Sequence, residues 1–228
     1  LQDHLDVLSH YECTQPVTEA KYTAGGLAFF RMAGILAQWL LTKKGAGNDI
    51  GLSGVSFLKT DDTLDLPDIQ MHFIGSLLKD HGKTRPDSHA FSNHVCMLRP
   101  ESRGYIALKS LDPHIQPIIQ PNYFSTQKDR DTLIKGVKMS REIMNQPAFD
   151  DFRGKEINPG DHIQTDQEIE EFIRNHGETI YHPVGTCKMG SDEFSVVDDK
   201  LRVRGVENLR VVDASVMPTL IGGNTNAP

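Results

Sequence analysis

The sequence predicts an α+β fold in which an antiparallel sheet is backed by helices. Short runs rich in β-branched and aromatic residues recur in the first half of the chain, and Gly, Pro and Asp fill the gaps between them, as turns require. Helical patterns with capping residues follow these runs. A length of 228 residues suits one or two domains with a sizeable core.

Five runs are predicted to be strands. They cover residues 6–14, 51–59, 69–74, 90–98 and 105–109. The first run ends at Gln15 and Pro16, which indicates a strand that leaves one domain for another. Together the runs are typical of one antiparallel sheet.

Residues 27–41 carry apolar side chains at helical spacing, and Lys43, Lys44 and Gly45 suit the end of a helix. Arg31 and Gln38 interrupt the segment, which is too short and too polar to span a membrane. We expect a packed amphipathic helix and keep a membrane-surface anchor as the alternative. The glycine-rich residues 45–51 have the wrong spacing for a dinucleotide-binding turn and indicate a helix cap and loop.

Two further helices are predicted in the second half of the chain. The first runs from about residue 126 to 145, is capped at Ser125 and stops before Pro147. Its inward side is formed by Leu133, Ile134, Val137, Ile143 and Met144. The second begins at Thr165, where Thr165 and Glu168 form a capping box, and ends near Gly177.

Composition excludes several classes of protein. The net charge of −7 repels phosphate backbones, so no nucleic-acid partner is expected. Three widely spaced cysteines favour reduced thiols over a disulfide framework or a zinc knuckle. No metal site is predicted, because the following histidines lack metal-ligand spacing and are assigned no site: His72, His81, His89 and His94.

The last fifth of the chain carries the candidate chemistry. His182 precedes Pro183, which holds its backbone extended, and a positioned histidine can take up and return a hydroxyl proton. From the residues alone, His182 fits better with an ordinary surface or satisfied core histidine, which is what most histidines in a globular chain are, and this chain has ten. Asp213 could simply cap the following turn, and Asn224 after two glycines could simply form a turn.

These segments resemble the glucose-methanol-choline (GMC) family of FAD-dependent oxidoreductases. Residues 182–190 read His-Pro-Val-Gly-Thr-Cys-Lys-Met-Gly, and residues 205–215 and 223–228 complete a C-terminal signature of that family. The opening Leu-Gln-Asp-His and residues 99–104, 108–113 and 121–123 resemble further family elements in family order. The resemblance therefore extends over nearly the whole chain.

The resemblance implies three parts. Residues 1–10 would be the tail of an FAD-binding domain, residues 11–178 a substrate-binding domain, and residues 179–228 a return to the α/β FAD-binding domain. No strand here leads into Gly-x-Gly-x-x-Gly, so the Rossmann half of that domain is not expected on this chain. Because the sequence opens without Met or a basic signal segment and stops within the signature, we expect a fragment cut at both ends.

The family's site residues transfer position by position. His182 matches the acid/base histidine, and Asn224, the sixth residue after Pro218, matches the second catalytic position. The family pattern places four residues at the FAD: Asp213, Ala214, Asn226 and Pro228. His4 would also lie near the flavin. Since an asparagine cannot take a proton at neutral pH, the acid/base work is expected of His182.

The implied reaction is oxidation of a primary alcohol to its aldehyde, with hydride transfer to flavin N5. The expected substrate is an uncharged primary alcohol, and choline is the alternative, because residues 140–149 resemble choline dehydrogenases. The electron acceptor is left open among a quinone, another carrier and oxygen. The expected location is the cytoplasm, with attachment to the inner face of a membrane as a second option. A non-catalytic stand-alone binding module or a structural paralogue is the competing hypothesis.

Overall fold

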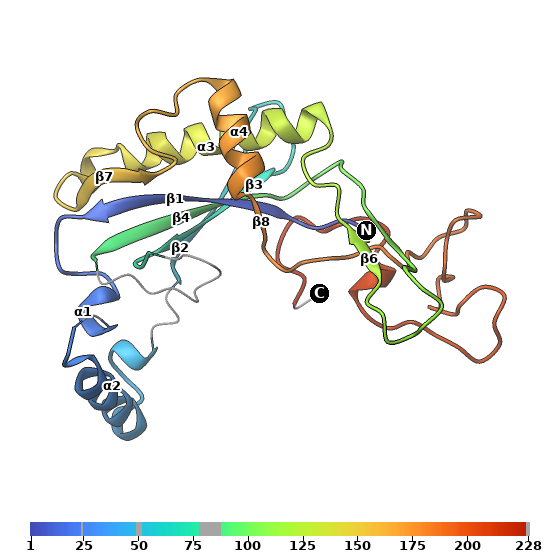
Figure 1. Ribbon diagram of the computed structural model, residues 1–228, viewed down its shortest axis with the longest axis horizontal. Coiled ribbons are helices and arrows are strands. Elements are labelled where there is room, and N and C mark those ends of the chain that lie inside the picture. Colours follow the sequence, from blue (N-terminus) through green and yellow to red (C-terminus); the bar gives the residue numbers. More distant parts are fainter. Residues whose placement is uncertain (24, 49–51, 78–87, 227–228) are drawn as a thin grey trace.

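The computed structural model describes residues 1–23, 25–48, 52–77 and 88–226. A six-stranded antiparallel sheet runs through its centre in the order β2-β3-β4-β1-β7, and β8 pairs with β1 as well (Figure 1). The strands of this sheet are β1 (Leu5–Cys13), β2 (Leu52–Leu58), β3 (Ile69–Ile74), β4 (Ala90–Met97), β7 (Arg153–Asn158) and β8 (Glu178–Thr179). The predicted antiparallel sheet is thereby confirmed.

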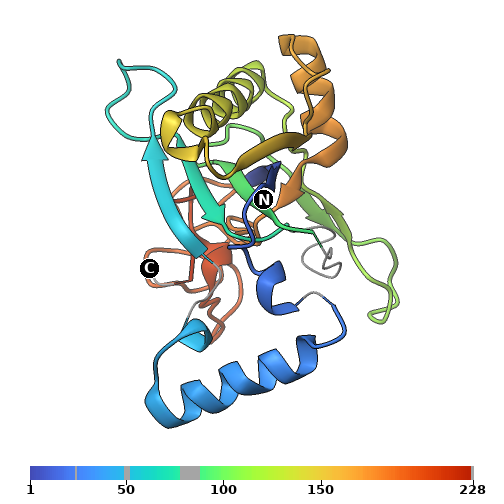
Figure 2. The same ribbon diagram turned by 90° about the vertical axis from the view of Figure 1, so that its left-hand side faces the viewer.

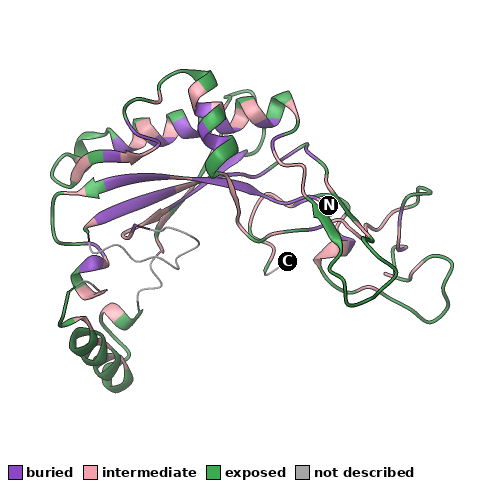
Figure 3. Cartoon of the chain, in the orientation of Figure 1, coloured by how far each residue is buried: buried purple, intermediate pink, exposed green. Residues whose placement is uncertain are grey.

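One face of the sheet is covered by two helices, α3 (Gln127–Met144) and α4 (Asp166–His176) (Figures 1 and 2). Alternate side chains of the central strands, such as Val7, Ile69 and Val95, point to this face and are fully buried. They pack against Leu133 and Val137 of α3 in the main hydrophobic core. Figure 3 shows this layer as the most buried part of the chain.

The predicted strand at residues 105–109 lies outside the main sheet. It forms β5 (Tyr105–Ala107), which pairs with β6 (Ile118–Gln120) in a separate two-stranded sheet. Both strands are largely exposed, and β6 was not predicted. β7 was missed as well, because its mixed residues Arg-Gly-Lys-Glu-Ile-Asn show no regular apolar alternation.

The helix ends test the capping predictions. Thr165 and Glu168 form the expected capping box at the start of α4, which confirms that prediction. The cap predicted at Ser125 is wrong by one residue: Thr126 accepts a hydrogen bond from the backbone of Asp129. The Ser125 hydroxyl instead donates to Ser102 Oγ at 2.9 Å, which ties the segment before α3 to the loop after β4.

Helix α2 (Ala28–Thr42) follows the short helix α1 (Ala20–Thr23) and projects from one side of the sheet (Figures 1 and 2). None of its residues is buried, so the expectation of a packed amphipathic helix is wrong for the described residues. The helix ends at Lys43, whose left-handed backbone forms the cap, and a 3₁₀ turn follows at Ala46–Asn48. No described helix is long and apolar enough to cross a membrane.

The C-terminal segment from residue 180 to 226 winds below the sheet with little regular structure (Figure 1). A bridge between Gln2 and Val184 ties it to the start of β1, and a 3₁₀ turn forms at Ala214–Val216. The predicted division after residue 10 falls within β1, which is continuous through Cys13. The three-part division itself stays a prediction.

Candidate active site

The face of the sheet opposite α3 and α4 is polar. His72 lies opposite His94 on neighbouring strands, and Cys96 lies opposite Asp6. Facing residues in an antiparallel pair point to the same side, and residues two apart along β1 do so as well. His72, His94, Asp6 and the neighbouring His4 are therefore gathered on one face and are all largely buried.

Asp3 is the residue that joins this face to His182. Its Oδ1 accepts the backbone N–H groups of His4 and His182, both at 2.9 Å. Its Oδ2 accepts the hydroxyl of Thr179 at 2.5 Å and the hydroxyl of Tyr123. Burial and the bond to Asp3 raise the pKa of Tyr123, so the phenol stays a donor to the carboxylate. The buried Asp3 carboxylate thus fixes the backbone of the candidate base.

The His182 ring is held from a second side. Its Nδ1 lies 2.9 Å from the hydroxyl of Thr225, and the Thr225 backbone N–H approaches the same nitrogen at 3.5 Å. The ring also meets His4 edge to face, with centroids 5.8 Å apart. In the tautomer in which Nδ1–H donates to the Thr225 hydroxyl, Nε2 carries the ring's free lone pair and is the atom that can take a proton from a substrate.

The loop that carries Asn224 lies beside His182. Thr225 contacts the His182 ring, and the carbonyl oxygen of Gly223 lies 3.2 Å from Nε2 of His4. Asn224, between these two residues, is exposed. The structure thus brings the loop of the second predicted catalytic residue against the first, across more than 40 residues of sequence.

His4 occupies the centre of this arrangement. Its two ring nitrogens lie against carbonyl oxygens of Met97 and Gly223, at 2.7 and 3.2 Å. Burial lowers the pKa of His4 despite these carbonyls, and the nearby His182 lowers it further. A neutral imidazole has a single N–H, so it can donate to only one of the two carbonyls at a time.

Asp6 and His94 form a buried pair. His94 Nδ1 donates to Asp6 Oδ2 at 2.5 Å. Burial alone would lower the pKa of His94, but the Asp6 carboxylate outweighs it and the pKa is raised, with Glu178 contributing. Asp6 Oδ1 and His94 Nε2 are both buried with no hydrogen-bond partner among the described residues. Buried polar atoms are normally satisfied, so this pair fits a polar ligand bound beside it.

His72 completes the polar face. Its ring lies edge to face with that of His94, at 6.2 Å between centroids. Burial lowers the pKa of His72, and the positive character of His94 lowers it further. His72 is therefore a neutral donor or acceptor at physiological pH rather than a second cation.

The residues predicted to contact FAD lie in the C-terminal segment. Asp213 caps the 3₁₀ turn at Ala214–Val216 by accepting the Ser215 backbone N–H at 2.8 Å. The side chain of Ser215, and then its backbone N–H, lower the pKa of Asp213. Asn226 is exposed, and Pro228 lies outside the described residues. The preceding Val212 is also exposed, although its sequence is typical of a buried strand. This edge of the chain is thus open to another layer of structure.

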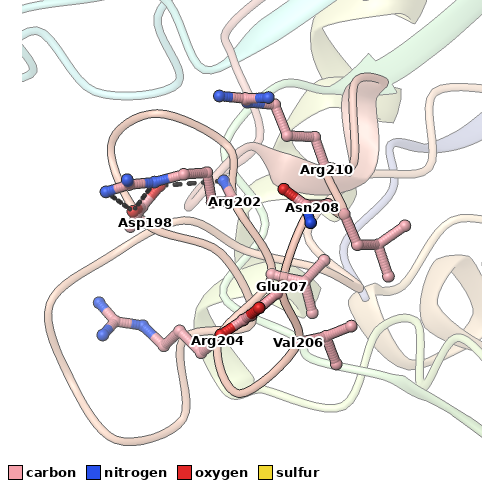
Figure 4. A pocket seen from close by; sticks show the side chains of 9 residues that line it. Asp198, Arg202, Arg204, Val206, Glu207, Asn208 and Arg210 are labelled. Atoms are coloured by element: carbon pink, nitrogen blue, oxygen red, sulfur yellow. Dashed lines mark hydrogen bonds and ion pairs between the residues drawn. The ribbon is translucent and has the colours of Figure 1, made fainter.

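A cavity in this segment lies apart from the predicted site. A cavity of about 540 Å³ is lined by residues 198–210, among them Arg202, Arg204 and Arg210 (Figure 4). Asp198 accepts from the Arg202 side chain at 2.8 Å inside it. None of its lining residues is among those that contact His182, which are Asp3, His4 and Thr225. We assign no catalytic or binding role to this cavity. No group of residues able to hold a metal ion is found in the described part of the chain.

Sequence reasoning missed Asp3, Asp6, His72 and His94 as members of the site. The two histidines were tested only as metal ligands and were assigned no role. The signal that could have identified them is the alternation of polar with apolar side chains along residues 4–10, 70–74 and 92–96. A sheet whose strands bury one apolar face can present its polar face to a bound ligand.

Comparison with known proteins assigns the family. Residues 100–228 match the family model described as GMC oxidoreductase. The chain is 46% identical over 227 residues to an oxygen-dependent choline dehydrogenase of Cronobacter sakazakii and 44% identical to one of Escherichia coli O139:H28. The chain belongs to the GMC oxidoreductase family. It spans 40% of the length of these two relatives, which in turn match all of it.

Solved structures agree on the fold. The chain resembles pyridoxine 4-oxidase from Mesorbium loti, with a TM-score of 0.78 and 26% identity, over 98% of this chain and 39% of that one. It also resembles the formate oxidase of Aspergillus oryzae RIB40, with a TM-score of 0.86 and 22% identity, over 97% of this chain and 43% of that one. The α+β arrangement of a sheet backed by helices is therefore that of GMC enzymes.

Proposed function

We propose that this chain is the substrate-binding and C-terminal part of an FAD-dependent oxidoreductase that oxidises a primary alcohol to an aldehyde. The observation that carries the proposal is the position of His182. Its backbone is fixed by buried Asp3 and its Nδ1 by Thr225, which leaves Nε2 for proton exchange. We assign the acid/base role to His182 and the second catalytic position to Asn224.

The proposed proton step follows from these contacts. A carbinol C–H becomes a good hydride donor when its hydroxyl loses a proton, and His182 Nε2 would take that proton. The Asn224 amide would donate a hydrogen bond to the developing alkoxide. A positioned base of this kind typically contributes about 10²–10⁴ in rate.

The residues present fit the flavin end of FAD. The buried polar face fits a polar reacting centre, because Asp6 Oδ1 and His94 Nε2 have no hydrogen-bond partner among the described residues. Exposed Val212 fits a covering layer. Bound FAD would supply the hydride acceptor. Asp213, Ala214 and Asn226 would hold it, together with Pro228 beyond the described residues. A glycine-rich pyrophosphate cradle is not found in this sequence.

An uncharged primary alcohol is the substrate that the site favours. The Asp6 carboxylate that bonds His94 already faces that histidine, whose raised pKa keeps it cationic to higher pH. The pair is therefore close to neutral overall. Choline is the second candidate, because the relatives that match the whole chain are choline dehydrogenases and because Asp6 Oδ1 is a buried acceptor with no hydrogen-bond partner in the described part of the chain.

The wider assignments are proposals of the same kind. We divide the chain into residues 1–10 and 179–228, which would belong with an FAD-binding domain, and residues 11–178, which would form the substrate-binding domain. The electron acceptor is proposed to be a quinone, another carrier or oxygen, and the location the cytoplasm. The described cysteines are free thiols, which agrees with a reducing compartment.

Anaerobic flavin reduction tests the proposal. The full-length gene product, purified with its flavin, is mixed with a medium-chain primary alcohol or with choline while the visible flavin band is followed. The expected result is bleaching by the alkanol, slowed at least about 100-fold in His182→Ala. Bleaching by choline alone would retain the mechanism and replace the substrate. A flavin-loaded protein that neither compound bleaches would refute the proposed function.

A further inference from the structure

Helix α2 carries a continuous apolar surface that the described residues leave uncovered. Rows of residues spaced seven and four apart lie above one another on a helix. The row of Ala28, Ile35 and Trp39 is half-buried, and Trp39 of this row contacts the 3₁₀ turn through a hydrogen bond from its Nε1 to Asn48 Oδ1 at 3.0 Å. The next two rows around the helix are exposed and consist of Phe29, Leu36 and Leu40, and of Phe30, Ala37 and Leu41.

The exposure of these rows is large. Phe29 is 76% exposed, Phe30 70% and Leu41 85%. Soluble proteins scatter single apolar side chains over their surface, but a contiguous patch of this kind marks an interaction site. Figures 1 and 2 show why nothing in the described chain covers it: α2 lies off the sheet, on the side away from α3 and α4, with its outer face free.

The charges around α2 indicate what covers it. The chain as a whole carries −7, yet residues 20–48 contain four basic residues and no acidic one. These cations are Lys21, Arg31, Lys43 and Lys44. Lys21 lies before the helix, and Lys43 and Lys44 follow its last turn. Arg31 lies on the narrow polar row of the helix, which Gln38 and Thr42 continue, so the four cations flank the apolar rows. The segment is thus locally opposite in sign to the rest of the chain.

Apolar rows framed by cations suit an anionic bilayer surface. A helix of 15 residues is about 22 Å long, shorter than the hydrocarbon core of a bilayer of about 30 Å. Such a helix lies in the interface, with its apolar side in the acyl boundary and its cations among the headgroups. Lys43 Nζ lies over the Trp39 ring, 4.1 Å from the ring centroid. Tryptophan concentrates at the headgroup level of a membrane, and the ammonium group of a lysine reaches the same level.

We propose that α2 is a membrane-docking helix that holds this protein on an anionic phospholipid surface. Phe29, Phe30, Leu36 and Leu41 would enter the acyl boundary, and the four basic residues would contact headgroup phosphates. The inference does not depend on the oxidoreductase assignment, because it rests only on the exposure and charge of residues 20–48. A second copy of the chain or the remainder of a longer protein are the competing occupants.

Vesicle co-sedimentation of the flavin-loaded, full-length protein tests the proposal. Vesicles of phosphatidylcholine are compared with vesicles in which about a quarter of the lipid is phosphatidylglycerol. The triple variant Phe29→Ser, Phe30→Ser, Leu41→Ser is the test. The matched control places serine at three apolar positions elsewhere that are similarly or more exposed: Leu108, Leu111 and Phe194. Lys43→Gln with Lys44→Gln tests the charge without changing the apolar rows.

The expected result is binding of the wild type and the control to anionic vesicles, with about tenfold weaker binding of the triple variant and of the lysine variant. High salt should weaken wild-type binding, and flavin content should stay unchanged in every variant. Equal sedimentation of wild type and triple variant would overturn the proposal. Loss of flavin by the triple variant would mean that the rows are internal packing, and a change from dimer to monomer in light scattering would assign them to a second copy.

Discussion

Replacement of Asp3 by alanine is predicted to damage both stability and catalysis. Asp3 is buried and accepts four hydrogen bonds, two of them from the backbone N–H groups of His4 and His182. Each buried donor left without an acceptor costs about 1–3 kcal/mol, so the two backbone groups alone predict a loss of about 2–6 kcal/mol in the free energy of unfolding. Because His182 loses the backbone contact that positions it, flavin reduction is expected to be slower by on the order of 100-fold.

Asparagine at the same position separates geometry from charge. An asparagine oxygen can keep both backbone bonds while its amide donates to the hydroxyls of Tyr123 and Thr179, which can act as acceptors. Asp3→Asn is therefore expected to retain most of the rate and to lose about 1–2 kcal/mol of stability.

The control for Asp3 is Asp68, a carboxylate buried to a similar extent. Asp68 accepts the backbone N–H and the hydroxyl of Thr60, away from His182. Asp68→Ala should lower the melting temperature without slowing flavin reduction. Thermal unfolding and stopped-flow flavin bleaching are measured on the same samples. An Asp3→Ala protein that reduces its flavin at the wild-type rate would refute the positioning role.

Three further predictions concern stability and packing. The raised pKa of His94 means that the Asp6–His94 pair stabilises the fold fully below the ordinary histidine pKa of about 6.5, and that this contribution is lost as pH rises through the raised value. The difference in unfolding free energy between wild type and His94→Gln, measured by urea titration, should therefore shrink from pH 5 to pH 9. A difference that stays constant over this range would contradict the assignment. Gly136→Ala should cost about 1–3 kcal/mol, because a Cβ there would lie 2.9 Å from side-chain carbons of Ile69 and Val95. Gly34→Ala, which meets nothing within 4 Å on α2, should instead stabilise the protein by about 0.5–1 kcal/mol in the same unfolding experiment.

The elements that sequence analysis found are those with a strong local pattern. The strand at residues 69–74 was predicted with its observed ends, and the capping box at Thr165 and Glu168 marked the start of α4 correctly. β7 was missed because its pairing partner, β1, lies about 140 residues earlier, and nothing local in its sequence marks the contact. Periodicity likewise identified α2 as a helix without showing whether its apolar rows meet protein or solvent.

The candidate site shows the same division. His182 and Asn224 lie in a compact motif, so a resemblance could point to them. Asp3, Asp6 and His94 acquire meaning only when antiparallel register places β1 beside β4, because His94 is 88 residues from its partner Asp6. Side-chain contacts over such separations are set by strand pairing, which a single sequence does not specify.

Chemical rescue of His182→Ala tests the central claim most directly. The first-order rate of flavin reduction by a saturating primary alcohol is measured in the full-length variant with and without added imidazole. The account predicts a rate at least about 100-fold below wild type that rises with imidazole, and more strongly as the fraction of neutral imidazole increases with pH. A variant that reduces its flavin at the wild-type rate would contradict the role of His182 as the base.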